Sequence, residues 1–168
     1  MKKEVFNFLK YITLAIAMVV FVNVVTAQSP TTLYSTDFGT TNVFPTGFTA
    51  SGGTTNWTDN STSPSTNYTG ASGGDNADNG TSGTAILIFN NGLSTAVYSG
   101  IVVTWGARMT STGASPTFQW SLDGTNWNTV SFTDVTNNST WGLVTVNLPS
   151  GASGVSNLEF RWTSNSGA

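Results

Sequence analysis

Carboxylates are the side chains of this chain best suited to acid–base catalysis, because its 168 residues include neither histidine nor cysteine. This composition excludes Ser-His-Asp and Cys-His catalysis, zinc sites built on imidazole or thiolate, and disulfide bonds. Two facing carboxylates could still hydrolyse a glycosidic bond, but no spacing in the sequence singles out such a pair. Glu159 has Arg161 on the same strand face, which predicts an ion pair instead. We therefore expect no enzyme and no catalytic residues.

A short acidic segment, 75–80, could hold a calcium ion, which prefers carboxylate and carbonyl oxygens. Asp75 and Asp78 would supply the carboxylates. An EF-hand is excluded, since the twelfth position counted from Asp75 is Ile86, an apolar residue in a strand-like run. Two alternatives remain, a structural calcium site completed by distant carbonyls and a solvated turn. No other cofactor is expected.

Exposed tryptophans could bind sugars by stacking on pyranose rings, and the chain has six tryptophans. Three of them alternate in phase with apolar rows and are expected in the core: Trp105, Trp120 and Trp162. The other three lie at strand ends or out of phase with the neighbouring apolar rows: Trp57, Trp127 and Trp141. These three are candidates for a ligand-binding platform, although packing at a hairpin or a β-bulge would explain them equally well.

The segment Ser121–Trp127 contains the strongest turn signal in the chain. Asp123-Gly124 between two strand-like runs predicts a β-hairpin with a type I′ turn, whose positive φ glycine tolerates freely. The segment resembles a shortened form of the Asp-box hairpin, Ser-x-Asp-x-Gly-x-x-Trp, found in sialidase-type propellers and other secreted β-domains. It lacks the residue between Asp and Gly. That resemblance implies a structural role. The residues themselves predict the same, with Asp123 capping turn amides and Trp127 folding back over the hairpin.

The N-terminus indicates where the protein works. Lys2, Lys3 and Lys10 precede or border an apolar run from Tyr11 to Val22, and small residues follow up to Ala27. This order predicts a signal-peptide helix in residues 1–27, removed after Ala27. The alternative, a transmembrane anchor, would need about 20 apolar residues. We therefore expect a secreted or cell-surface protein with no membrane attachment after cleavage.

The mature region, residues 28–168, has the size of one domain and is acidic. It carries two arginines, Arg108 and Arg161, against seven acidic residues, a formal charge of −5. Binding of nucleic acid needs clustered basic side chains, so it is excluded as a function.

Short apolar rows of period two, separated by Gly, Ser and Asn, predict an all-β protein without a helix after the signal peptide. Ile86–Phe89 is apolar on both faces and predicts a central strand covered on both sides. The long polar segment from Thr58 to Gly83 is expected to be a loop. The other expected strands are 33–38, 101–109 with Trp105 inward, 118–122, 144–148 and 158–162. Together they indicate an antiparallel β-sandwich.

Four segments make the mature chain similar to a family of N-terminal jelly-roll domains in secreted and cell-surface proteins of polysaccharide-degrading bacteria: Leu33–Gly39, Phe44–Phe48, Phe118–Trp127 and Leu158–Trp162. This family resembles galactose-binding-like and carbohydrate-binding-module sandwiches. The resemblance implies a further strand after residue 167, so the domain is expected to lack its last strand. It also implies a calcium ion near the first and last strands, with Asp37 as a ligand.

The resemblance implies a non-catalytic binding or accessory module with a polysaccharide or other glycan as its partner. Two alternatives remain open at this stage. The chain could be a structural spacer or adhesin domain, or it could be the N-terminal accessory domain of a larger secreted hydrolase.

Overall fold

The computed structural model describes residues 29–41, 43–51, 58–60, 64–79, 83–110, 116–135 and 139–166. The predicted signal-peptide helix and Trp57 lie outside these residues. Leu33–Ala168 forms a compact unit of its own, separate from Met1–Thr32. The described ranges contain no α-helix, only the 3-10 turn η1 (Ser150–Ala152). In the same ranges, no helix is long and apolar enough to cross a membrane.

The larger layer is an antiparallel five-stranded sheet with the order β1-β4-β9-β6-β7. Its two long strands, β4 and β9, lie next to each other in the interior of the sheet, where a bulge interrupts their register between Phe89 and Leu93. The strands are β1 (Phe48–Ser51), β4 (Gly83–Leu93), β6 (Thr117–Ser121), β7 (Asn128–Val130) and β9 (Leu158–Ser166).

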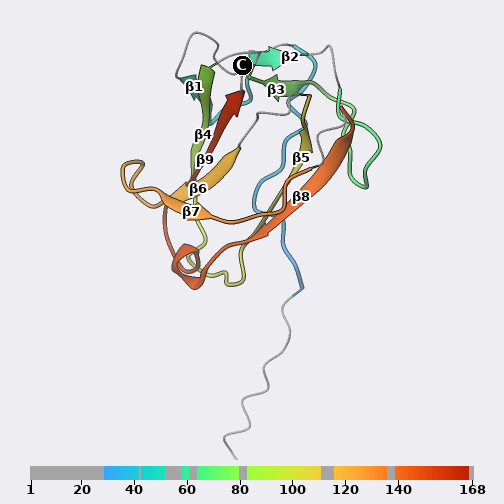
Figure 1. Cartoon of the computed structure of the whole chain (residues 1–168). Helices are drawn as coiled ribbons and strands as arrows, with labels where there is room; N and C mark the ends of the chain where they lie inside the picture. The colour runs from blue at the N-terminus through green and yellow to red at the C-terminus, as the bar shows by residue number, and fades with distance from the viewer. Residues whose placement is uncertain are drawn as a thin grey trace, which may run out of the picture. The chain divides into compact units, whose positions relative to one another are not determined.

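The second layer consists of β5 (Val102–Arg108) and β8 (Trp141–Asn147), paired antiparallel along their whole length. Figure 1 shows this pair facing the larger sheet. Two short strands, β2 (Thr58–Asn60) and β3 (Asn76–Asp78), form a separate antiparallel pair. The all-β, antiparallel, sandwich-like fold is therefore confirmed.

The core lies between the two layers, because strands present alternate side chains to opposite faces. Trp105 on β5 reaches across to the larger sheet, with its ring centroid 4.9 Å from that of Phe118 and 5.9 Å from that of Trp162. Phe118 is fully buried and also contacts Phe160. The buried apolar cluster consists of Phe89, Ile101, Phe118, Trp120, Val144, Val146, Leu148, Ala152, Leu158 and Phe160, with Trp105 and Trp162 packed against it.

One strand prediction was wrong and another was too long by one residue. The segment 33–38 joins no ladder, although the Tyr34 ring packs on Phe89 with centroids 4.5 Å apart. Phe38 has a positive φ of 61°, which takes the chain out of the extended conformation. Leu122 was expected on the inward row after Trp120, but β6 ends at Ser121 and Leu122 is 43% exposed.

Two further predictions were correct only in part. Ile86–Phe89 does lie in an interior strand, between β1 and β9. Only the Leu87 and Phe89 side is buried, however, while Ile86 and Ile88 are half-buried on the outer face. The segment 58–83 was expected to be a loop, yet Thr58 pairs with Asp78 and Asn60 with Asn76 in the β2–β3 ladder.

A buried threonine joins two connections at one end of the sandwich. Thr95 is fully buried, and its Oγ1 donates a hydrogen bond to the Ala152 carbonyl of η1 (2.8 Å) and accepts one from the Val155 N–H (3.2 Å). Its backbone N–H donates to the Val155 carbonyl, and its carbonyl accepts from Gly154. Thr95 therefore links the chain after β4 to the chain before β9.

Candidate functional site

The outer face of the five-stranded sheet carries a continuous row of side chains, one from each strand. The register places Thr49 opposite Ile88, Ile88 opposite Arg161, Arg161 opposite Gln119, and Gln119 opposite Thr129. Side chains directly opposite each other on neighbouring strands are close enough to interact. We call these five residues the outer row; its polar members on β9, β6 and β7 are joined by hydrogen bonds.

Gln119 is the centre of that hydrogen-bonded group, and Arg161 is its charged member. Arg161 Nε and Nη2 both donate to Gln119 Oε1, at 2.8 and 2.6 Å, and Gln119 Nε2 donates to Thr129 Oγ1 at 3.0 Å. Because an arginine has no acceptor, the amide oxygen of Gln119 must face it, and this orients the whole amide. Partial burial lowers the pKa of Arg161 from its ordinary value, and the side chain remains a cation.

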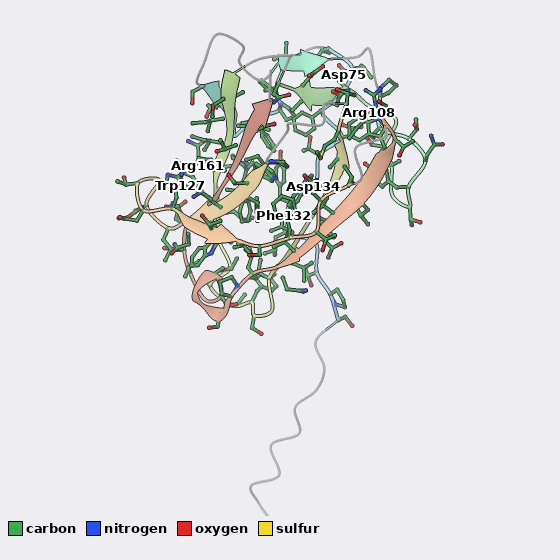
Figure 2. The ribbon with its side chains drawn as sticks, in the orientation of Figure 1. Asp75, Arg108, Trp127, Phe132, Asp134 and Arg161 are labelled. Atoms are coloured by element: carbon green, nitrogen blue, oxygen red, sulfur yellow. The ribbon has the colours of Figure 1, made fainter. Side chains whose placement is uncertain are left out.

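The guanidinium of Arg161 lies over the ring of Trp127. Arg161 Cζ lies 4.4 Å from the centroid of the Trp127 ring, which is the geometry of a cation–π contact. Figure 2 shows the two side chains together beside the β6–β7 hairpin. Trp127 is half-buried and lies outside both the apolar cluster, which contains Trp120, and the residues packed against it, which include Trp105 and Trp162. The tryptophan expected to be out of phase with the core thus lies on the outer face, against a charged side chain.

The β6–β7 hairpin positions Trp127 through a loop ordered by Asp123. Asp123 Oδ1 accepts hydrogen bonds from the N–H groups of Thr125 (2.9 Å) and Asn126 (2.7 Å) and from Ser121 Oγ (3.0 Å), while Oδ2 accepts one from Asn126 Nδ2 (2.7 Å). These bonds, led by that from the Asn126 backbone, hold the pKa of Asp123 well below its usual range. The capping role predicted for Asp123 is confirmed.

The predicted turn type is wrong, although the hairpin is confirmed. A type I′ turn needs positive φ at two adjacent residues, but in this loop only Gly124 has one (67°). The connection between β6 and β7 therefore spans Leu122 to Trp127. The loop folds onto β9, because Asn157 Nδ2 donates both to the Leu122 carbonyl and to Glu159 Oε1.

The predicted ion pair between Glu159 and Arg161 does not form. Glu159 accepts its hydrogen bond from Asn157 at 2.8 Å, and a Cβ atom on Gly124 would lie 2.9 Å from its Oε2. Arg161 is held by Gln119, and no salt bridge joins it to an acid within the described ranges. Residues two apart share a strand face, but here Arg161 binds Gln119 on the neighbouring strand and Glu159 binds Asn157, on its other side along the chain.

Trp141 begins β8 on the other layer, opposite Arg108 in the register. It borders an open hollow of about 430 Å³, together with Asp134, Val135 and Leu143. Asp134 Oδ1 accepts a hydrogen bond from the Val135 N–H, while its buried Oδ2 has no partner. Burial raises the pKa of Asp134, because partial removal from water disfavours its charged form. Figure 2 shows Asp134 and Phe132 on the connection from β7 to β8.

The residues predicted for calcium lie at another part of the molecule, near β3. The Asp75 N–H donates to the Gly39 carbonyl (2.9 Å), and Asp37 Oδ1 accepts from the Gly39 N–H (2.9 Å). Gly74 packs directly on the Asp37 carbonyl, so the loops of Asp37 and Asp75 touch. Asp78 lies on β3, paired with Thr58. Within the described ranges no three acidic side chains gather as a metal site, and calcium remains a prediction.

Comparisons of the chain with protein-family models, with curated proteins and with solved structures find no match. Function must therefore be argued from the site. Sequence reasoning did not identify Gln119 and Arg161 as a pair. A signal was present, since both occupy polar positions that alternate with inward aromatic residues in predicted strands.

Proposed function

We propose that this protein is a secreted, non-catalytic binding module for a glycan, and that the glycan binds on the outer row beside Trp127. One observation supports this most directly: Trp127 lies outside the core, against Arg161, next to hydrogen-bonding side chains held in place. A sugar ring presents apolar C–H faces as well as hydroxyl groups. An aromatic ring beside fixed polar groups suits both, which is the usual composition of a small-molecule site.

The proposal includes a jelly-roll topology of the carbohydrate-binding type and a location outside the cell or at its surface. The antiparallel layers and the aromatic core support the first part. The predicted signal peptide supports the second. A structural calcium ion at Asp37, Asp75 and Asp78 belongs to the same proposal and is supported by the contact between the loops of Asp37 and Asp75.

Affinity gel electrophoresis through a panel of soluble polysaccharides tests the proposal. The purified protein should be retarded by at least one polymer, and Trp127→Ala should abolish this retardation with little change in melting temperature. Trp141→Ala is the matched control, because Trp141 is a half-buried outward tryptophan on the other layer. It should bind as the wild type does.

Two results would contradict the proposal. If no polysaccharide retards the intact protein, a structural spacer or adhesin role is favoured. If Trp141→Ala abolishes retardation while Trp127→Ala does not, the ligand binds at the hollow beside Asp134 and the outer row is not the site.

A further inference from the structure

Arg161 keeps one edge of its guanidinium open. Gln119 Oε1 occupies the edge formed by Nε and Nη2. The adjoining edge, formed by Nη1 and the second N–H of Nη2, has no partner within the described ranges. Nη1 is not among the buried polar atoms that lack a partner, so solvent reaches it. Two parallel N–H groups of this kind bind both oxygens of a carboxylate at once.

Within the part of the chain that the structure describes, no acidic side chain neutralises the positive charge of Arg161. Its hydrogen-bond partner, Gln119, is neutral, and its ring partner, Trp127, is also neutral. Glu159 is the acid on β9, but it accepts a hydrogen bond from Asn157 and lies beside Gly124 of the hairpin. The mature region has seven acids and two arginines, yet no carboxylate is paired with this arginine within the described ranges.

The guanidinium is also held in place before any ligand arrives. Gln119 fixes one edge of it and the Trp127 ring packs against it, with Thr129 orienting the Gln119 amide. An arginine ordered in this way loses little conformational entropy when it binds, so more of the interaction energy appears as affinity.

We infer that Arg161 recognises the anionic group of an acidic glycan through its open edge. The shared chemistry is a pair of negatively charged oxygens, supplied by the carboxylate of a uronic acid or by a sulfate ester. This inference rests on the proposed function, because it assigns the ligand class for the same outer face. It adds that a charged substituent, besides the sugar ring, is required for tight binding.

Titration calorimetry with three polymers tests the inference: polygalacturonate carries carboxylates, dextran sulfate carries sulfates, and dextran is neutral. The wild type should bind at least one anionic polymer roughly tenfold more tightly than dextran, as expected for one hydrogen-bonded charge pair. Added salt should weaken this binding, because it screens exposed charges. The polymer that binds more tightly identifies the source of the oxygens.

Arg161→Gln should lower the affinity for the anionic polymer roughly tenfold. Arg108→Gln, which removes the same charge from β5 on the other layer, is the matched control and should leave the affinity unchanged. Gln119→Glu is a second variant that keeps Arg161. It places a carboxylate against the occupied edge, neutralises the guanidinium and should also lower the affinity, with a melting temperature at least equal to that of the wild type.

Equal affinity for dextran and the anionic polymers, unaffected by Arg161→Gln and Gln119→Glu, would overturn this inference and leave the proposed function standing. Absence of binding to all polysaccharides, including those in the gel panel, would overturn both. If Arg161→Gln fails to fold, Gln119→Glu and the salt dependence of the wild type decide the question. Undiminished binding by Gln119→Glu would then refute the inference.

Discussion

Replacing Thr95 by valine should destabilise the protein without opening a cavity, because the two side chains have nearly the same shape. The change removes the hydrogen bond to the Ala152 carbonyl and the one from the Val155 N–H. Each bond contributes about 1 kcal/mol net, and a stranded buried group costs about 1–3 kcal/mol more. Thr95 is fully buried and Ala152 also, so the stranded carbonyl cannot turn to water. We expect a loss of about 2–4 kcal/mol in the free energy of unfolding.

Urea denaturation followed by tryptophan fluorescence measures this loss, and thermal melts should show a drop on the order of 10 °C. Ser94→Ala is the neighbouring control: Ser94 is exposed and its Oγ lies 3.4 Å from the Val155 carbonyl, so its loss should cost less than about 0.5 kcal/mol. Thr95→Ser keeps the hydroxyl and loses only a methyl group. If Thr95→Ser is more destabilising than Thr95→Val, packing and not hydrogen bonding holds this junction, and the reasoning is refuted.

Three further outcomes are expected. Phe118→Ala should cost about 3–5 kcal/mol in the free energy of unfolding, because the ring is fully buried. Trp127→Ala should cost less than about 1 kcal/mol. Equal losses of the two variants in urea denaturation would contradict the placement of Trp127 outside the core. Burial raises the pKa of Asp134, so its stabilising contribution is present below the unfolded-state pKa and is lost as pH rises through the folded-state value. Asp134→Asn should therefore gain melting temperature relative to the wild type between acidic and neutral pH, and a difference that stays constant with pH would argue against this. N-terminal sequencing of secreted protein should begin at Gln28, whereas residues 1–27 retained in a membrane fraction would disprove cleavage.

The inner faces of the strands could be predicted because period-two alternation is local. Trp105, Val144 and Phe160 each alternate with polar or exposed neighbours, and each packs in or against the core. The same pattern failed for 33–38, whose residues have strand-like composition. A strand also needs a partner, and with Phe38 at positive φ this segment contributes its rings to the core without joining a ladder.

The candidate site could be predicted only in part, because it depends on contacts between residues far apart in the sequence. The position of Trp127 outside the core followed from its phase. Its contact with Arg161 did not, since it depends on the register between β6 and β9, which the alternation within either strand leaves open. For the same reason the ion pair expected between Glu159 and Arg161 failed. Arg161 binds its cross-strand neighbour Gln119, while Glu159 accepts a hydrogen bond from Asn157, two residues earlier in the chain.

Neighbouring residues of β9 face opposite sides of the sheet, so they can be changed with different consequences. Phe160 and Trp162 face the core, where a change of volume affects stability, while Arg161 between them faces outward. Each strand of the larger sheet contributes one position to the outer row, so five substitutions could alter the face without touching an inward side chain. The sheet thus offers a scaffold on which the chemistry of the outer face can be changed, for example by a combinatorial library, while the fold is kept.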